Sequence, residues 1–252
     1  MEYWNMVKNA ESGEEELKID GEIRMEQSFW DWYLKKPDRS ASGLEKAIKG
    51  AAGKNLVVWI NSNGGSCAAA SVIYSALMEH KRNGGTITAK VNTAISAASV
   101  IAMAADRVLM APTGIMMIHN PWTYAEGEVK DMQKAIEILT QVKESIINAY
   151  QKKTGKSREE IGSLMDTETW MSAKKAMELG FADGTLYEEE VDTQVQDGIL
   201  KGARQVYNSI SKESFAEKLK ELLKEDDDQP SAKEQADFSY LENKLRLEKA
   251  RF

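Results

Sequence analysis

The sequence predicts an α/β protein made of repeated βαβ units around a mostly parallel sheet. Leu56-Val57-Val58-Trp59-Ile60 is an apolar run of strand length, which is typical of a parallel strand buried on both faces. Strand-like and helix-like segments alternate between residues 55 and 118, as βαβ units require. A long amphipathic helical pattern then covers residues 128–153, with Lys and Glu on its polar side.

Each expected element has a local signal. Alternation around Gly21 predicts an edge strand at residues 17–23, and glycines end a short amphipathic helix at 44–50. The buried strand at 55–61 leads through Asn63-Gly64-Gly65-Ser66 into an alanine-rich helix. The further elements, in order, are helix 68–80, strand 86–92, helix 97–105, strands 107–111 and 115–118, the long helix 128–153, and helices 158–165 and 172–179.

The composition changes after about Tyr187. An apolar helical stripe at 215–223 is followed by the acidic run 225–228, and these residues offer too few apolar positions for a core of their own. We therefore expect an N-terminal segment over residues 1–16, one domain over 17–187, and a charged extension with short helices over 188–252.

Composition excludes several classes of protein. With 33 Lys+Arg against 40 Asp+Glu among 252 residues, the net charge of −7 gives no basic surface for nucleic acid. The single cysteine, Cys67, excludes an intramolecular disulfide and a cysteine-rich zinc site. The most apolar segment, 94–105, is shorter than the ~20 residues that span a bilayer. We expect a cytoplasmic protein without nucleic-acid or membrane partners.

Only two histidines, His80 and His119, are available as a general base. His80 is followed by Lys81-Arg82 at the end of a helix, which indicates a cationic, solvated C-terminal turn. His119 ends the apolar strand 115–118 and precedes Asn120-Pro121, at a place where functional side chains often gather. From its position alone, His119 is either a plain strand-end residue or a catalytic base.

Two further positions allow both a structural and a catalytic interpretation. Ser96 lies between a strand and a helix, where it is either a helix N-cap or a nucleophile facing free backbone N–H groups. Ser99, one turn later, is expected to face neighbouring helices. Gly64-Gly65 is either an ordinary turn or a source of bare backbone amides for a ligand. The phosphate-loop pattern occurs nowhere in the sequence, so ATP dependence would require another chain.

Four segments resemble motifs of the ClpP serine peptidases in order and approximate spacing. They are INSNGG at 60–65, AISAA at 94–98, MIHNP at 117–121, and residues 170–183, which run from WMSA to LGFAD. The resemblance covers about residues 17–186. The variant Asn120-Pro121-Trp122 and the extended tail look most like the ClpP-related proteins of prophage and tailed-phage head gene clusters.

The resemblance implies a ClpP/crotonase-like fold with a protruding handle helix, and a serine endopeptidase without cofactor or metal. Ser96 would be the nucleophile, His119 the general base, and the amides of Gly64 and Ala97 the oxyanion hole. Glu168 stands where the family has its aspartate, and Asp166 remains the alternative third member.

The resemblance also implies partners. ClpP-type subunits form homo-oligomeric rings, commonly of seven, through a handle helix that residues 128–153 would supply; alternatively, this helix only covers its own sheet. Substrates would be extended protein chains, such as phage capsid or scaffold proteins in head maturation, or proteins delivered by a Clp ATPase in trans. A catalytically silent ring subunit is the alternative function. His119 argues against a crotonase-like acyl-CoA enzyme or a Ser-Lys peptidase.

Overall fold

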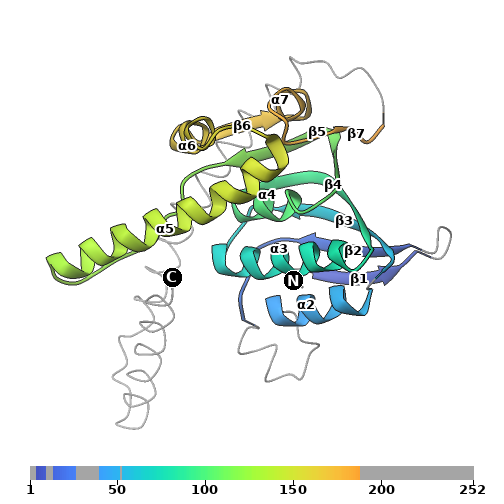
Figure 1. The fold of residues 1–252 in the computed structure, drawn as a ribbon, viewed down its shortest axis with the longest axis horizontal. Helices are drawn as coiled ribbons and strands as arrows, with labels where there is room; N and C mark the ends of the chain where they lie inside the picture. The colour runs from blue at the N-terminus through green and yellow to red at the C-terminus, as the bar shows by residue number, and fades with distance from the viewer. Residues whose placement is uncertain (1–3, 10–13, 27–39, 52, 188–252) are drawn as a thin grey trace, which may run out of the picture. The chain divides into compact units, whose positions relative to one another are not determined.

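The computed structural model describes residues 4–9, 14–26, 40–51 and 53–187 (Figure 1). The chain divides into two compact units, one of residues 1–121 with 142–200 and the other of residues 122–141 with 201–252. The division falls within the long helix α5 (Val129–Thr154). We call the first the sheet unit, because it contains all the strands of the described residues. The short helices expected after residue 188 lie outside the described residues.

A seven-stranded sheet confirms the predicted α/β class. Strands β2 to β5 are mutually parallel, β1 and β6 pair antiparallel at the two ends of the strand order, and β7 runs parallel to β5. The strands are β1 (Trp4–Lys8), β2 (Glu15–Asp20), β3 (Asn55–Ser62), β4 (Thr86–Ile95), β5 (Arg107–Ile118), β6 (Thr169–Ser172) and β7 (Gly184–Thr185).

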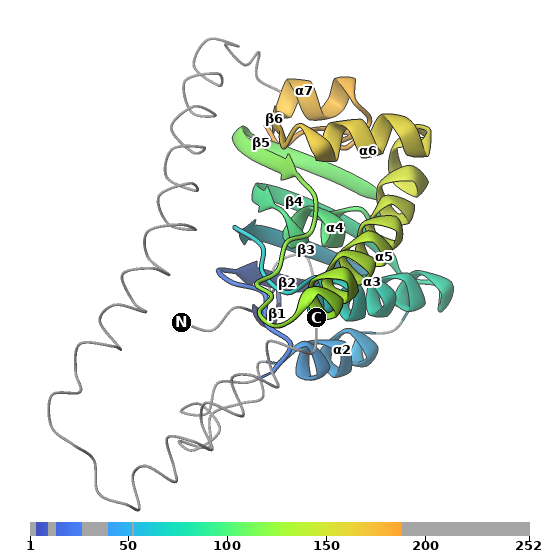
Figure 2. The ribbon, with the colours of Figure 1, turned by 90° about the vertical axis from the view of Figure 1, so that its left-hand side faces the viewer.

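Helices connect the parallel strands in the way that βαβ units predict. Helices α2, α3 and α4 lie on one face of the sheet, and α6 and α7 lie beside β6 (Figures 1 and 2). Their bounds are α2 (Ala41–Gly50), α3 (Cys67–Arg82), α4 (Ala97–Ala102), α6 (Arg158–Asp166) and α7 (Ala173–Glu178). A serine side chain caps the N-terminus of four of them, namely Ser40, Ser66, Ser157 and Ser172. Within the described ranges, no helix combines the length and apolar character needed to cross a membrane.

The core is built from β-branched and aliphatic strand residues and from alanines on the helices. All six residues of α4 are buried. Three of them are alanines and one is a serine, and these small side chains allow the helix to approach β4 closely, which fixes the position of the residue just before it, Ser96. Only Ile147, Ala149 and Tyr150 of α5 are buried, all within the sheet unit. In the other unit, Val129 and Ile136 of the same helix are largely exposed.

The N-terminal edge of the sheet differs from the prediction. The strand expected at 17–23 is β2, but it is not at the edge, because β1 pairs with it from Trp4↔Ile19 to Lys8↔Glu15. Residues expected to precede the domain thus contribute to its sheet. The sequence signal was weak because three of the five β1 residues are exposed and only Trp4 is buried.

The two strands expected at 107–111 and 115–118 form one strand, β5. The strand continues through Pro112-Thr113-Gly114, with a register shift against β4 between Val91 and Thr93. Gly114 permits this, since a Cβ there would lie 2.8 Å from Ala111 O and 3.0 Å from Val91 O. Strands β6 and β7, which the sequence did not predict, pair with the later and earlier parts of β5.

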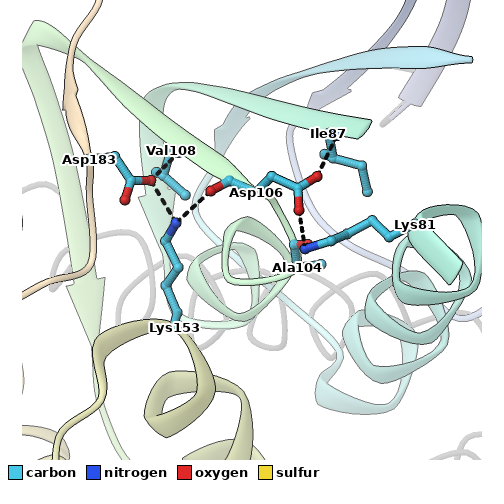
Figure 3. A network of polar contacts seen from close by, with 7 residues as sticks. All are labelled: Lys81, Ile87, Ala104, Asp106, Val108, Lys153 and Asp183. Carbon is cyan, nitrogen blue, oxygen red and sulfur yellow. Dashed lines mark hydrogen bonds and ion pairs between the residues drawn. The ribbon is translucent and has the colours of Figure 1, made fainter. Parts of the chain in front are cut away.

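A polar network joins the elements at the amino ends of β4 and β5 (Figure 3). Lys81 Nζ lies 2.6 Å from Asp106 Oδ1, while Asp106 Oδ2 accepts a 2.9 Å hydrogen bond from Ile87 N–H. Lys153 Nζ donates to Asp183 Oδ2 at 2.6 Å and to Asp106 O at 3.2 Å. These contacts tie α3, β4, β5 and α5 together at the edge of the sheet opposite the candidate site.

Candidate active site

The candidate site lies where the carboxyl ends of three parallel strands meet. Ser62 ends β3, Ile95 ends β4 and Ile118 ends β5. Because parallel strands end at the same edge of a sheet, the residues that follow them become neighbours. These residues are the Gly64-Gly65 turn, Ser96 and His119, which the sequence singled out from three separate segments.

Ser96 and His119 are in direct contact. Ser96 Oγ lies 2.7 Å from His119 Nε2, a hydrogen bond in which the hydroxyl donates when the imidazole proton is on Nδ1. Ser96 occupies the N-cap position of α4, yet its side chain makes no capping hydrogen bond. The N-cap interpretation of Ser96 therefore fails, and its hydroxyl is committed to the histidine. Both residues are half-buried, so a substrate has access to them.

The backbone of Ser96 is strained. Its φ of 57° and ψ of −126° are unusual for a residue with a side chain and cost on the order of 1–3 kcal/mol. The Ser96 N–H donates to Met117 O at 2.9 Å, which ties the strained residue to β5 just before His119. A nucleophile on a sharp strand-to-helix turn exposes its hydroxyl in this way.

Glu168 and His119 lie just beyond the last pair of residues that joins β5 and β6. Strands β5 and β6 pair antiparallel up to Ile118↔Thr169, so the next residues along the two segments are His119 and Glu168. Burial lowers the pKa of His119 below its ordinary value of 6.5, and the Glu168 charge partly opposes this effect. Trp170 Nε1 donates to Glu168 Oε1 at 3.0 Å and orients the carboxylate. Among non-glycine residues in the described ranges, only Ser96 and Glu168 have positive φ.

Asp166, the alternative acid, is engaged elsewhere. Its Oδ1 accepts hydrogen bonds from Asn120 Nδ2 at 2.8 Å and from Lys143 Nζ at 2.5 Å. The Lys143 hydrogen bond, followed by that from Asn120, holds the pKa of Asp166 below its ordinary value. Asp166 is also exposed, whereas Glu168 is half-buried. The geometry thus favours Glu168 as the acid beside His119.

The glycine turn lies against the peptide group that follows Ser96. Gly64 has φ +96°, and a Cβ there would lie 2.7 Å from Ile95 O, 2.8 Å from Ser96 Cβ and 3.1 Å from Ala97 N. Ala97 is the first residue of α4, so its N–H has no acceptor within the helix. The turn backbone and the Ala97 amide therefore border the same space beside Ser96 Oγ.

The two glycine amides of this turn are not equivalent. Gly64 N–H donates to Ser62 Oγ at 3.1 Å, within the turn itself. Gly65 forms a parallel β-bridge with Ile23. In this bridge Ile23 N–H donates to Gly64 O, and Ser66 N–H donates to Ile23 O. The peptide groups on either side of Gly65 therefore face Ile23, and the Gly65 N–H points away from it. Across the described residues this amide has no acceptor, and Gly65 is exposed. The family resemblance implied the amide of Gly64, and the neighbouring Gly65 of the same Gly64-Gly65 pair is the residue whose N–H has no acceptor among the described residues.

Gly64→Ala should destabilise the fold sharply. We expect the free energy of unfolding to fall by about 2–4 kcal/mol, because the new Cβ meets backbone atoms and φ is positive. Urea denaturation followed by tryptophan fluorescence measures this change. Gly162→Ala is the matched control, since nothing lies within 4 Å of a Cβ there, and it should be neutral or slightly stabilising. Equal stability of the two variants would contradict the tight contact at Gly64.

His80 is not the solvated residue that its neighbours indicated. Its side chain is buried, and its Nε2 lies 2.9 Å from Lys54 O, so the ring donates from Nε2 to this carbonyl. Gly85 packs directly on the ring, with a Cβ position 2.1 Å from Nε2. The prediction was wrong because α3 turns this face toward the protein. His119 therefore remains the histidine at the candidate site.

Comparisons with known proteins agree with the fold and the geometry. The sequence model of the family described as Clp protease matches residues 47–189, more than half of the chain. The chain is 34% identical over 140 residues to the ATP-dependent Clp protease proteolytic subunit 1 of Chlamydia trachomatis serovar D, covering 54% of this chain and 71% of that protein.

Two further relatives carry similar names. The subunit 1 protein of Chlamydia muridarum is 30% identical over 137 residues, with 54% of this chain and 71% of the relative covered. The proteolytic subunit of Chlorella vulgaris is 29% identical over 132 residues, covering 52% of this chain and 65% of that protein. The family match spans the turn at Gly64-Gly65, Ser96, His119 and Glu168, and the resemblance found in the sequence is confirmed: this chain belongs to the Clp protease family.

Proposed function

We propose that this chain is a serine endopeptidase that cleaves peptide bonds with Ser96 as nucleophile, His119 as general base and Glu168 as the acid that orients the histidine. The 2.7 Å hydrogen bond between Ser96 Oγ and His119 Nε2 is the observation that carries the proposal. Membership of the Clp protease family and the names of its relatives support it.

The reaction is an acyl transfer in two halves. His119 Nε2 takes the Ser96 proton as Oγ attacks the substrate carbonyl carbon, and it then gives this proton to the leaving amine. Water, deprotonated by His119, attacks the acyl-enzyme and releases the carboxylic acid product and free Ser96. Glu168 accepts a hydrogen bond from His119 Nδ1–H and stabilises the imidazolium formed in each half.

Backbone amides stabilise the negative oxygen of the tetrahedral intermediate. Ala97 N–H supplies one donor, and the Gly64-Gly65 turn supplies the other. Gly64 was the donor expected from the family resemblance, but its N–H already donates to Ser62 Oγ, whereas the Gly65 N–H has no acceptor in the described part of the chain. Each preorganised donor of this kind contributes about 10²–10³ in rate.

We further propose that the active form is a homo-oligomeric ring in the cytoplasm. The exposed apolar residues Val129 and Ile136 on α5 need a partner surface, and a handle helix would supply it through a second copy. Native mass spectrometry should give an assembly that is a multiple of the 28.1 kDa chain, with seven copies expected. A monomer at micromolar concentration would contradict this.

Two biological settings fit the same chemistry. One is phage capsid maturation, with scaffold or capsid proteins as substrates, as the prophage-like motif variants suggest. The other is proteolysis with a Clp-type ATPase in trans, which the names of the ATP-dependent relatives favour. Casein degradation with and without such an ATPase and ATP separates them, since strong stimulation supports the second setting and its absence the first.

Covalent labelling tests the proposed activity directly. A fluorophosphonate probe should modify the assembled protein at Ser96, and peptide mapping by mass spectrometry should locate the adduct there. An oligomer that is not labelled at Ser96 would favour the alternative function, a catalytically silent ring subunit.

The labelling rate should fall at acidic pH with an inflection below 6.5. His119 must be neutral to act as a base, and burial lowers its pKa from the ordinary value of 6.5, with Glu168 partly opposing this effect. The rate therefore rises as the pH increases through the lowered pKa, and it is close to its plateau by neutral pH. In Glu168→Gln the opposing charge is absent, so the inflection should move to still lower pH. An inflection above 6.5 in the native protein would contradict this assignment.

A further inference from the structure

A buried chain of hydrogen bonds leads from α5 to the peptide group that follows Ser96. Ser99 Oγ donates to Ser96 O at 2.6 Å, and Ser99 N–H donates to the same oxygen at 2.9 Å. The Tyr150 hydroxyl lies 2.8 Å from Ser99 Oγ. Because the single hydroxyl proton of Ser99 is directed to Ser96 O, Tyr150 is the donor in this second contact.

Burial isolates these hydrogen bonds from water. Ser99 is 0% exposed and Tyr150 is 1% exposed. Burial also raises the pKa of Tyr150 well above its ordinary value, so the phenol stays protonated and able to donate. The Tyr150 ring packs edge-on against Phe181, with centroids 5.6 Å apart, which holds the hydroxyl in place. No solvent is available to replace either hydrogen bond if one partner is removed.

These hydrogen bonds control the direction of the Ala97 N–H group. Ser96 C=O and Ala97 N–H belong to one planar trans peptide group, in which the carbonyl and the N–H point in opposite directions. Two donors from Ser99 fix the carbonyl toward the interior, so the N–H points outward. Gly64 lies close to this N–H group, since a Cβ on Gly64 would be 3.1 Å from Ala97 N.

The same contacts fix the strained backbone of Ser96 on its carbonyl side. Ser96 N–H is fixed by Met117 O, and Ser96 O is fixed by Ser99. A residue at φ 57° stays there only when its surroundings determine both flanking peptide groups. Ser99 and Tyr150 thus act on the nucleophile and on the adjacent amide together.

We propose that Ser99 and Tyr150 are positioning residues that orient the Ser96–Ala97 peptide group, and with it both the nucleophile and one oxyanion-hole donor. This inference rests on the proposed peptidase function. Neither side chain touches the reacting atoms: Tyr150 acts through Ser99, and Ser99 acts through the backbone. Both residues should therefore affect the chemical step more than the binding of substrate.

Ser99→Ala, Tyr150→Phe and the double variant test this in the assembled full-length protein. The concentration dependence of fluorophosphonate labelling separates the inactivation rate constant kinact from the binding constant KI. Ser99→Ala should lower kinact about tenfold, which corresponds to one lost buried hydrogen bond, with KI within about twofold. Tyr150→Phe should lower kinact about threefold, since Ser99 still reaches Ser96 O. The double variant should match Ser99→Ala, because Tyr150 acts only through Ser99.

A second readout isolates the oxyanion-hole amide. A leucine-containing tripeptide aldehyde, which forms a tetrahedral adduct on Ser96, should bind more weakly to Ser99→Ala by the same factor as kinact. The corresponding peptide alcohol, which forms no adduct, should bind equally to both proteins. Competition against fluorophosphonate labelling measures both affinities.

Controls separate positioning from loss of stability. Ser40→Ala removes another buried serine, the N-cap of α2, and Tyr74→Phe removes the hydroxyl of a half-buried tyrosine on α3. Unchanged kinact and aldehyde affinity in Ser99→Ala and Tyr150→Phe would overturn the inference. An equal fall of kinact in Ser40→Ala and Tyr74→Phe, at the same loss of Tm, would also overturn it. If Ser99→Ala does not fold, the kinact of Tyr150→Phe tests the inference, since this variant keeps the ring contact with Phe181 and is expected to fold. Absence of labelling in the native protein would instead overturn the proposed function itself.

Discussion

Ser96→Ala should reduce peptide hydrolysis by on the order of 10⁴- to 10⁶-fold in kcat. The substitution removes the hydroxyl whose oxygen lies 2.7 Å from His119 Nε2, so no acyl-enzyme can form. His119→Ala should cost a similar factor, because Ser96 then has no base to accept its proton. The Ser96→Ala, His119→Ala double variant should be no worse than either single variant, since the two side chains act as one unit. Cleavage of fluorogenic casein by the assembled protein measures these rates.

Matched substitutions elsewhere distinguish loss of chemistry from loss of folding. Ser163→Ala changes an exposed serine on α6 and should leave both stability and rate unchanged. His80→Gln removes the other histidine of the chain, whose ring bonds to Lys54 O, and should lower Tm while the folded fraction keeps its rate. Residual activity in Ser96→Ala above one-hundredth of the native rate would contradict the assignment of the nucleophile.

Glu168→Gln should reduce kcat by roughly 10²- to 10⁴-fold. The amide keeps the size of the side chain but removes the charge that stabilises the imidazolium of His119. The expected effect is large because the Glu168 charge acts on His119 just beyond the last β5–β6 pair, and because burial of His119 limits solvation of its charge. Steady-state kinetics with the same casein substrate gives the ratio of kcat in the native protein to kcat in Glu168→Gln.

Asp166→Asn is the matched control for the triad acid. Asp166 bonds to Lys143 and Asn120 and is exposed, so removal of its charge breaks a surface ion pair worth about 0–1 kcal/mol. The kcat of Asp166→Asn should stay within about threefold of the native value. A greater loss in Asp166→Asn than in Glu168→Gln would reverse the assignment and make Asp166 the acid.

Local sequence patterns were sufficient for most elements and for selecting Ser96 and His119, which the structure brings into contact. Helix periodicity located α2, α3, α5, α6 and α7 within a few residues of their observed ends. The scarcity of histidine and the strand-to-helix position of Ser96 reduced the candidates for base and nucleophile to a few. These inferences succeed because hydrophobic periodicity and turn chemistry are properties of short segments.

Other features depend on contacts between distant segments. His80 has charged neighbours in the sequence, yet it is buried, because packing of α3 brings it to Lys54 O, 26 residues earlier. The register of β1 against β2 and the continuity of β5 through Pro112 are likewise set by neighbouring strands rather than by the segments themselves.

The sequence by itself determined the α/β class, the order of the βαβ units and the pairing of one serine with one histidine as candidates. Only the tertiary structure showed that Asp166 bonds to Lys143 and Asn120, that the Gly65 amide has no acceptor among the described residues, and that Ser99 joins Tyr150 to the backbone of Ser96. The physical reason is that each of these depends on which atoms face one another across strands and helices. Such facing is set by long-range register and packing, which short-range periodicity does not encode.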